Sequence, residues 1–322
     1  MAETNINITP AALSTSATKF RKELLLMAII ALEKSTQHMT VRMGIQGKEY
    51  VGQLDGEGEL GPYDADRVDN DDAPITGREL ETFFGSVIKR FDPNQVLGSI
   101  YGSLVNSGEA LKGVPITAQM VAFLMKSISK NLNRSLFSAV RNASGTKTKD
   151  LFNGFDTIAQ TEITAGNIST AKKNLYNFSE VIDKTNAVDA LKAFYWASSD
   201  ELQEEELTKM FIPRDIYNAY TEDYQATVNA TPYNKEYKKT FLEGSNDSCE
   251  LVPLASKKGS NFIQLTPRSN MLVGVDQMGN KEKINIDRFE SFRLTLSAAM
   301  YFGTQYESIS PEKLLIGKLF TT

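Results

Sequence analysis

The sequence predicts an α+β fold, and three observations support this prediction. Residues 117–142 contain no glycine or proline, and their apolar residues recur at three- and four-residue steps, as in a long amphipathic helix. Most of the predicted strands lie beyond residue 200, as short apolar or alternating runs. Residues 55–74 form a stretch rich in Gly, Asp and Asn. A structureless stretch of this length is uncommon inside a compact domain, so it indicates an extended or functional element.

Composition limits the chemistry that this chain can perform. Its 322 residues, 41% of them hydrophobic, suffice for one large fold or two subdomains. The single cysteine, Cys249, excludes an intrachain disulfide and fits a reducing compartment. The single histidine, His38, excludes a zinc site built from several histidines, and we expect it to be a structural residue. A net charge of −5 disfavours general binding to nucleic acid, which needs a clustered positive field.

The N-terminal part predicts a buried helix followed by a hairpin. Residues 15–37 are expected to form the helix, because their centre, LLLMAIIAL (24–32), is apolar on all sides. A secretion signal is the less favoured alternative, since charged residues follow the run directly and nine residues fall short of the ~20 that span a bilayer. The runs TVRMGI (40–45) and EYVGQL (49–54) predict two paired strands.

The remaining elements are assigned from capping and periodicity. Thr76 and Glu79 form a capping-box pattern, which predicts a helix over 77–91 that ends before Pro93. Further helices are expected over 170–183, 186–199 and 214–226. Strands are expected at 207–212, 249–254, 261–265, 271–275, 284–287, 291–302 and 313–317.

The long helix over 117–142 combines an apolar face with a basic one. Its apolar face consists of Val121, Leu124, Met125, Ile128, Leu132, Leu136 and Val140. Four bases fall on the opposite side, with two phenylalanines among them: Lys126, Lys130, Arg134, Arg141, Phe123 and Phe137. Phenylalanine on a charged face predicts that another surface covers it.

Two regions carry complementary charge. Residues 52–81 contain ten acidic and two basic residues, a net charge of −8, whereas residues 112–149 contain seven basic and no acidic residues. If the acidic stretch reaches the long helix of a neighbouring copy, the contact is head-to-tail and builds rings or lattices. The alternatives are pairing within one chain and simple exposure to solvent. The acidic residues assigned to the contact are Asp64, Asp66, Asp69, Asp71 and Asp72.

Motifs for the common enzymatic and metal-dependent chemistries are missing. The sequence has no phosphate-binding Walker loop, no GxGxxG between a strand and a helix, no CxxC and no HExxH. The acidic stretch does not match a calcium loop, because Val68 stands where an oxygen ligand is needed. The run Glu204–Glu206 is expected to be a solvated face, and Cys249 a buried apolar residue. We therefore expect no enzyme activity, no cofactor and no bound metal.

Three stretches carry a resemblance to a known family. SLFSAVRNASGTKTKDLFNGFDTI (135–158) leaves the long helix through a turn rich in Gly and Thr. NFIQLTPRSNMLVGVD (261–276) has the pattern of a strand and turn, and SFRLTLSAAMYFGTQYESISPEKLLI (291–316) that of a long strand followed by a short one. In this order of elements, residues 36–322 resemble the major capsid proteins of tailed bacteriophages, which have the Hong Kong 97-type fold.

The resemblance implies a division of the chain into five parts. Residues 1–37 would be an N-terminal arm and 38–75 an extended loop. Residues 76–149 would be a peripheral domain whose spine is the long helix, and 150–285 an axial domain. Residues 286–322 would supply the strand that returns to the peripheral domain and a C-terminal strand. Because few residues precede the loop, scaffolding is expected from a separate protein or not at all.

The function implied by the resemblance is that of a capsid subunit. Copies would assemble as pentamers and hexamers into an icosahedral phage or prophage head, within the bacterial cytoplasm, around double-stranded DNA bound without sequence specificity. A scaffolding protein and a portal are further implied partners, and a membrane is not. An encapsulin, the shell of a cellular compartment, is the first alternative. A different virion component and an unrelated enzyme or ligand-binding protein are the others.

Overall fold

The computed structural model describes residues 35–54, 75–91, 116–205, 207–228, 241–276, 284–290 and 293–320. Helices and strands are mixed along this part of the chain, which confirms the predicted α+β class. The helix expected over 15–37 lies almost entirely outside the described residues, as does the acidic stretch 55–74.

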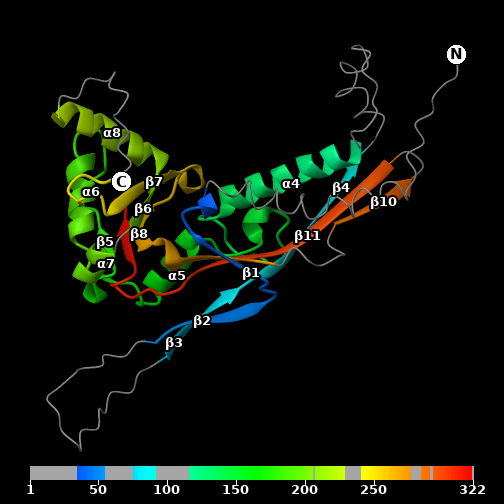
Figure 1. Ribbon diagram of the computed structural model, residues 1–322, viewed down its shortest axis with the longest axis horizontal. Coiled ribbons are helices and arrows are strands. Elements are labelled where there is room, and N and C mark those ends of the chain that lie inside the picture. The colour runs from blue at the N-terminus through cyan, green and yellow to red at the C-terminus, as the bar shows by residue number, and fades with distance from the viewer. Residues whose placement is uncertain are drawn as a thin grey trace, which may run out of the picture.

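Most of the described strands belong to two five-stranded sheets (Figure 1). The first, here called the long sheet, contains β1 (Thr40–Met43), β4 (Phe83–Phe91), β9 (Met271–Val275), β10 (Ile284–Glu290) and β11 (Arg293–Tyr306). Its centre is β11, which pairs antiparallel with β4, β9 and β10. The helix α4 (Ile116–Ser135) runs along this sheet.

The second sheet, here called the buried sheet, separates two hydrophobic cores. Its strand order is β5-β12-β8-β6-β7. The bounds are β5 (Leu175–Asn177), β6 (Thr208–Pro213), β7 (Cys249–Leu254), β8 (Phe262–Pro267) and β12 (Leu315–Lys318). Successive side chains of a strand point to opposite faces, so Phe262 packs in the core with α4 and α5 (Phe155–Thr164), whereas Ile263 packs in the other core. That second core is covered by α6 (Ala187–Trp196), α7 (Asp200–Glu204) and α8 (Arg214–Val228).

A two-stranded ribbon projects from the body of the subunit (Figure 1). It pairs β2 (Lys48–Leu54) antiparallel with β3 (Ile75–Glu81). The predicted hairpin of 40–45 with 49–54 is therefore wrong. The chain instead turns out of the long sheet at Gly44 and Gly47, both at positive φ (92° and 103°), and β1 pairs in parallel with β9. Glycine is the residue that adopts such φ values without steric cost.

The helix expected over 77–91 is also wrong, because these residues form β3 and β4. A capping-box pattern is a weak local signal, and the tertiary pairing of both strands outweighs it. The two strands meet at buried Thr82, whose hydroxyl donates a hydrogen bond to the carbonyl of Ile45 (3.1 Å). The aromatic and β-branched residues of FFGSVIKRF are the strand signal that the capping pattern obscured.

Two helix predictions are wrong, one because of backbone hydrogen bonds and one because of a left-handed residue. The long helix ends at Ser135 and not at 142. The carbonyls of Phe137 and Ala139 accept hydrogen bonds from Asp156 (3.0 Å) and Gly154 (2.8 Å) at the start of α5, so they are not available to continue a helix. Residues 170–183 contain only a 3-10 turn and β5, since Lys173 adopts a left-handed backbone (φ 58°). The helices expected over 186–199 and 214–226 are confirmed as α6 and α8.

The strands predicted beyond residue 200 are confirmed, including the one that carries Cys249. That side chain is fully buried in β7, as expected, and burial raises the pKa of its thiol to about 12. At pH 8 only about one thiol in ten thousand would be the reactive thiolate. We expect iodoacetamide to leave the folded chain unlabelled while it modifies the urea-unfolded chain fully. Mass spectrometry measures this, and rapid labelling of the folded chain would contradict the buried placement.

Candidate functional site

The exposed side of α4 carries a row of positive charge. Lys126, Lys130 and Arg134 recur every four residues, and residues spaced by four lie one above the other on a helix. All three are exposed, whereas Leu124 and Leu132 on the other side of α4 are buried. The predicted basic and apolar faces are therefore seen for residues 124–134, whereas Val140, predicted on the apolar face, lies beyond the helix and is exposed.

The positive surface continues beyond the end of α4. Arg141 is exposed, and its guanidinium lies over the ring of Phe83 at 4.3 Å from the centroid. Contact with a ring face favours a cation, so the side chain is held against β4. Lys147 and Lys149 follow on an exposed turn, which is closed by the carboxylate of Asp150 accepting a hydrogen bond from the Lys147 amide (3.0 Å).

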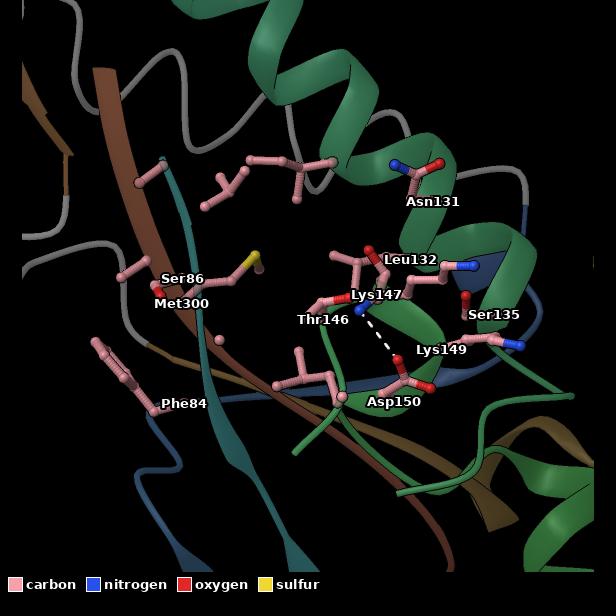
Figure 2. A pocket seen from close by; sticks show the side chains of 18 of the residues that line it. Phe84, Ser86, Asn131, Leu132, Ser135, Thr146, Lys147, Lys149, Asp150 and Met300 are labelled. Atoms are coloured by element: carbon pink, nitrogen blue, oxygen red, sulfur yellow. Dashed lines mark hydrogen bonds between the residues drawn. The ribbon is translucent and has the colours of Figure 1, made fainter. Parts of the chain in front are cut away.

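A groove of about 760 Å³ lies between α4, the turn at 141–151 and the strands β4 and β11. Figure 2 shows its lining, with Asn131 and Ser135 on α4, Lys147 and Lys149 on the turn, and Phe84 on the strand side. Five of its lining residues are basic and one is acidic: Lys89, Arg134, Arg141, Lys147, Lys149 and Asp150. The groove therefore favours an acidic occupant that presents polar atoms to its serines, threonines and asparagines.

Lys89 was not among the expected site residues. It belongs to β4, which the sequence analysis placed in a helix. In FFGSVIKRF, aromatic and β-branched residues are frequent, which is a signal for a strand. That signal indicates the strand, but the position of Lys89 near α4 follows only from the pairing of β4 with β11.

Phe137 is not on the basic face, and this part of the prediction is wrong. Its side chain is fully buried between α4, α5 and the buried sheet, with ring contacts to Phe155 (5.6 Å) and Phe211 (6.2 Å). Because the helix ends at Ser135, helical geometry does not apply to position 137. Phe123 lies within α4, but its side chain is outside the described residues, as are Asp64, Asp66, Asp69, Asp71 and Asp72.

The single histidine is held by structural contacts. His38 lies 3.4 Å from the Lys209 ammonium and 3.9 Å from the Glu250 carboxylate, and Lys209 and Glu250 form an ion pair. Burial, followed by the nearby Lys209 charge, lowers the pKa of His38. Within the described ranges, no group of three or more His, Cys, Asp or Glu side chains is arranged to hold a metal ion.

Among the helices that the structure describes, none is both long and apolar enough to cross a membrane. No family model and no curated protein matches the sequence.

Solved structures do match the fold along most of the chain. The capsid of a native GTA particle superposes with a TM-score of 0.56 at 12% identity, over 90% of this chain and 91% of that chain. The capsid of cyanophage A-1(L) gives 0.55 at 12% identity, over 91% and 92%. The holo-SrpI encapsulin from Synechococcus elongatus PCC 7942 gives 0.53 at 10% identity, over 88% and 86%. The chain therefore has the fold that these capsid proteins and this encapsulin share, which confirms the resemblance to phage capsid proteins at the level of the fold.

Proposed function

We propose that this chain is a major capsid protein that assembles with copies of itself into an icosahedral phage or prophage head. The observation that carries the proposal is the extent of the structural match, which spans about nine-tenths of both chains in the phage and GTA capsids. A match of this extent leaves little of the chain to form a separate catalytic domain. Because fold alone does not determine function, assembly has to be tested directly.

The parts of the capsid subunit follow from the elements. The ribbon β2–β3 together with residues 55–74 would be the extended loop, which then continues to Glu81 and not only to residue 75. The long sheet and α4 would form the peripheral domain. The buried sheet with α5 to α8 would form the axial domain, around which pentamers and hexamers gather. The strand β11 would be the strand that returns to the peripheral domain.

The proposed contact joins the extended loop of one subunit to the basic surface of the next. The acidic occupant is the stretch with Asp64, Asp66, Asp69, Asp71 and Asp72. The receiving surface is the exposed row on α4, the turn at 141–149 and the groove beside them. An acidic segment from a second copy suits this surface, and the head-to-tail geometry propagates from subunit to subunit.

The other partners follow from this role. The finished shell would enclose double-stranded DNA without reading its sequence, and the subunit would be part of the virion after assembly in the cytoplasm of the host bacterium. A portal and a separate scaffolding protein would take part in assembly. The role requires no enzyme activity, cofactor or metal ion from this chain.

The proposal predicts that the purified chain forms closed shells, or rings of five or six subunits, when observed by negative-stain electron microscopy after size exclusion. Assembly should be studied at low and moderate salt, because the proposed contact is electrostatic and salt screens it. The same experiment is then repeated with a scaffolding protein co-expressed from the neighbouring genes. A chain that stays monomeric both alone and with the scaffolding protein would contradict the proposal.

The encapsulin match supports a second candidate, the shell of a cellular compartment. The two candidates differ in content and not in the fold of the shell. Shells purified from the native source would contain double-stranded DNA if the chain is a capsid protein, and a packaged protein if it is an encapsulin. Nuclease-protected DNA and the protein composition of the same particles decide between them.

A further inference from the structure

A half-buried arginine helps to attach the base of the ribbon to the body of the subunit. Arg78 lies on β3 opposite Val51 of β2, and its side chain is only 15% exposed. Val51 packs with Leu80 and Leu272 in a small buried cluster beneath the ribbon. The two strands are thus tied to the body at this point, while beyond it Figure 1 shows the ribbon projecting away.

Arg78 contacts acceptors on two other elements. Its guanidinium donates to the Glu162 carboxylate at the end of α5 (2.6 Å), to the side-chain oxygen of Gln305 (3.2 Å) and to the backbone carbonyl of Tyr306 (3.2 Å). Gln305 in turn donates to the Glu79 carbonyl on the ribbon (3.0 Å). A planar guanidinium can reach several acceptors at once in a fixed geometry, which a lysine cannot reproduce.

Glu162 is itself held in place. The Asn167 side chain donates to its other carboxylate oxygen (2.7 Å). Burial on its own would raise the pKa of Glu162, but the hydrogen bonds from Asn167 and Arg78 outweigh it and lower the pKa. The carboxylate is therefore kept charged next to Arg78, and the pair fixes the ribbon relative to α5.

A pair of glycines lies directly outside this attachment. Gly77 of β3 is in register with Gly52 of β2, one position farther from the body than Arg78 and Val51. Neither space nor backbone conformation demands glycine at position 77: its φ is not positive, and an added Cβ would meet only Tyr50 Cδ1 at 3.7 Å. Two facing glycines leave a strand pair without side-chain packing, which makes it easy to bend.

We propose that Arg78 clamps the base of the ribbon to α5 and β11, and that the ribbon bends at the adjacent pair Gly52–Gly77. The inference rests on the proposed function, because its consequence concerns shell geometry. Subunits in pentamers and hexamers meet neighbours at different angles, so a loop that reaches a neighbour needs one fixed end and one defined point of bending. Arg78 is thus a positioning residue that determines where the bending begins.

Hydrogen exchange of the soluble subunit tests the clamp without requiring assembly. In Arg78→Met, backbone amides in residues 75–81 should exchange roughly ten-fold faster than in the wild type, because the ribbon loses its attachment. Lys48→Met is the matched control: it removes an exposed ribbon ion pair with Glu79 (2.7 Å) that does not involve the body. Equal exchange in Arg78→Met and the wild type would overturn the proposal.

Particle diameters test the consequence for the shell. Arg78→Met should give a broader distribution of diameters than the wild type, because the ribbon direction is no longer fixed. Gly77→Val introduces a β-branched residue that stiffens the strand, and should reduce the yield of closed shells in favour of open sheets or rings. Electron microscopy measures both: an unchanged diameter distribution in Arg78→Met would refute the clamp, and an unchanged yield of closed shells in Gly77→Val would refute the bending point.

Two variants keep the test decisive if Arg78→Met does not fold. Arg78→Lys retains the charge but not the fork of donors, and Glu162→Gln retains an acceptor but not its charge. Both should show intermediate acceleration of exchange in residues 75–81, and wild-type exchange in both would overturn the clamp. If the wild type itself forms no shell, the proposed function fails, while the exchange results still decide whether the clamp exists.

Discussion

Replacing Lys126, Lys130 and Arg134 together with glutamate should prevent assembly at the protein concentration at which the wild type assembles, and leave the subunit folded. All three side chains are exposed on α4, so their replacement disturbs no buried contact. Glutamate is as good a helix former as lysine or arginine, so α4 itself should persist. In the proposed contact, the reversal would turn attraction to the acidic loop of the neighbouring subunit into repulsion.

The expected size of the effect follows from surface electrostatics. At roughly 1 kcal/mol for each reversed charge, one contact loses about 3 kcal/mol, which raises the protein concentration needed for assembly about 100-fold. Size exclusion and electron microscopy measure assembly, and circular dichroism measures folding. A triple variant that assembles at the wild-type concentration would show that the acidic stretch does not bind this surface.

A graded series separates charge from shape. The triple glutamine variant should assemble at a concentration between those of the wild type and of the glutamate variant. A compensating variant carries lysine in place of the five loop aspartates, Asp64, Asp66, Asp69, Asp71 and Asp72. Combined with the glutamate variant, the compensating variant should restore assembly. If assembly is not restored, the effect of the glutamate variant comes from overall charge and not from a contact between these two regions.

The sequence predicted the elements whose signals are local and strong. The strands of the buried sheet are mostly apolar, as in Phe262–Pro267, where all six residues are buried because both faces of the sheet are covered. The helix α4 was recognisable from its period, and the exposure of Lys126 and Lys130 followed from that period. The order of these elements was sufficient to indicate the fold.

Apart from the turn at Lys173, the failures have one physical origin, which is bonding between residues that are not neighbours in sequence. The end of α4 is determined by hydrogen bonds to residues 154–156, and no residue near 135 indicates it. The segment 75–91 forms strands because β2 and β11 pair with it, against a local capping pattern. The burial of Phe137 and the position of Lys89 both depend on these two events, so that part of the candidate site could not be obtained from local signals.

Beneath Phe137 lies a buried charge whose removal is expected to have the largest effect on stability. The side chain of Lys257 is completely buried, and its ammonium lies 3.2 Å from the Asp156 carboxylate and 4.4 Å from the centroid of the Phe137 ring. It also donates a hydrogen bond to the side chain of Gln264, which in turn donates to Asp156 (2.7 Å). This cluster joins α5, β8 and the segment just beyond the end of α4, so it fixes that segment against α5 and the buried sheet.

Lys257→Met should lower the free energy of unfolding by about 3 kcal/mol, because it leaves the Asp156 carboxylate, whose side chain is only 12% exposed, without its cation. Lys258→Met is the matched control, since Lys258 is the neighbouring lysine and is exposed. Urea unfolding followed by circular dichroism measures both. The double variant Lys257→Met, Asp156→Asn should lose less than the sum of the two single variants, because the remaining amide can still bond to Gln264. Additive losses would mean that the charges do not act as a pair.

The pH dependence of the same variant gives an independent check with a defined sign. Burial is the main cause that lowers the pKa of Lys257 below its usual 10.5, so the unfolded chain binds this proton more tightly than the folded one. Below the folded-state pKa, this difference in proton binding lowers the free energy of unfolding. The loss becomes smaller as the pH rises from the folded-state pKa towards 10.5. The stability advantage of the wild type over Lys257→Met should grow over that alkaline range, measured as the difference between two urea curves at each pH. The Lys258→Met control should show no such growth, and a flat difference for Lys257→Met would mean that the Asp156 carboxylate fully offsets the effect of burial on the pKa of this lysine.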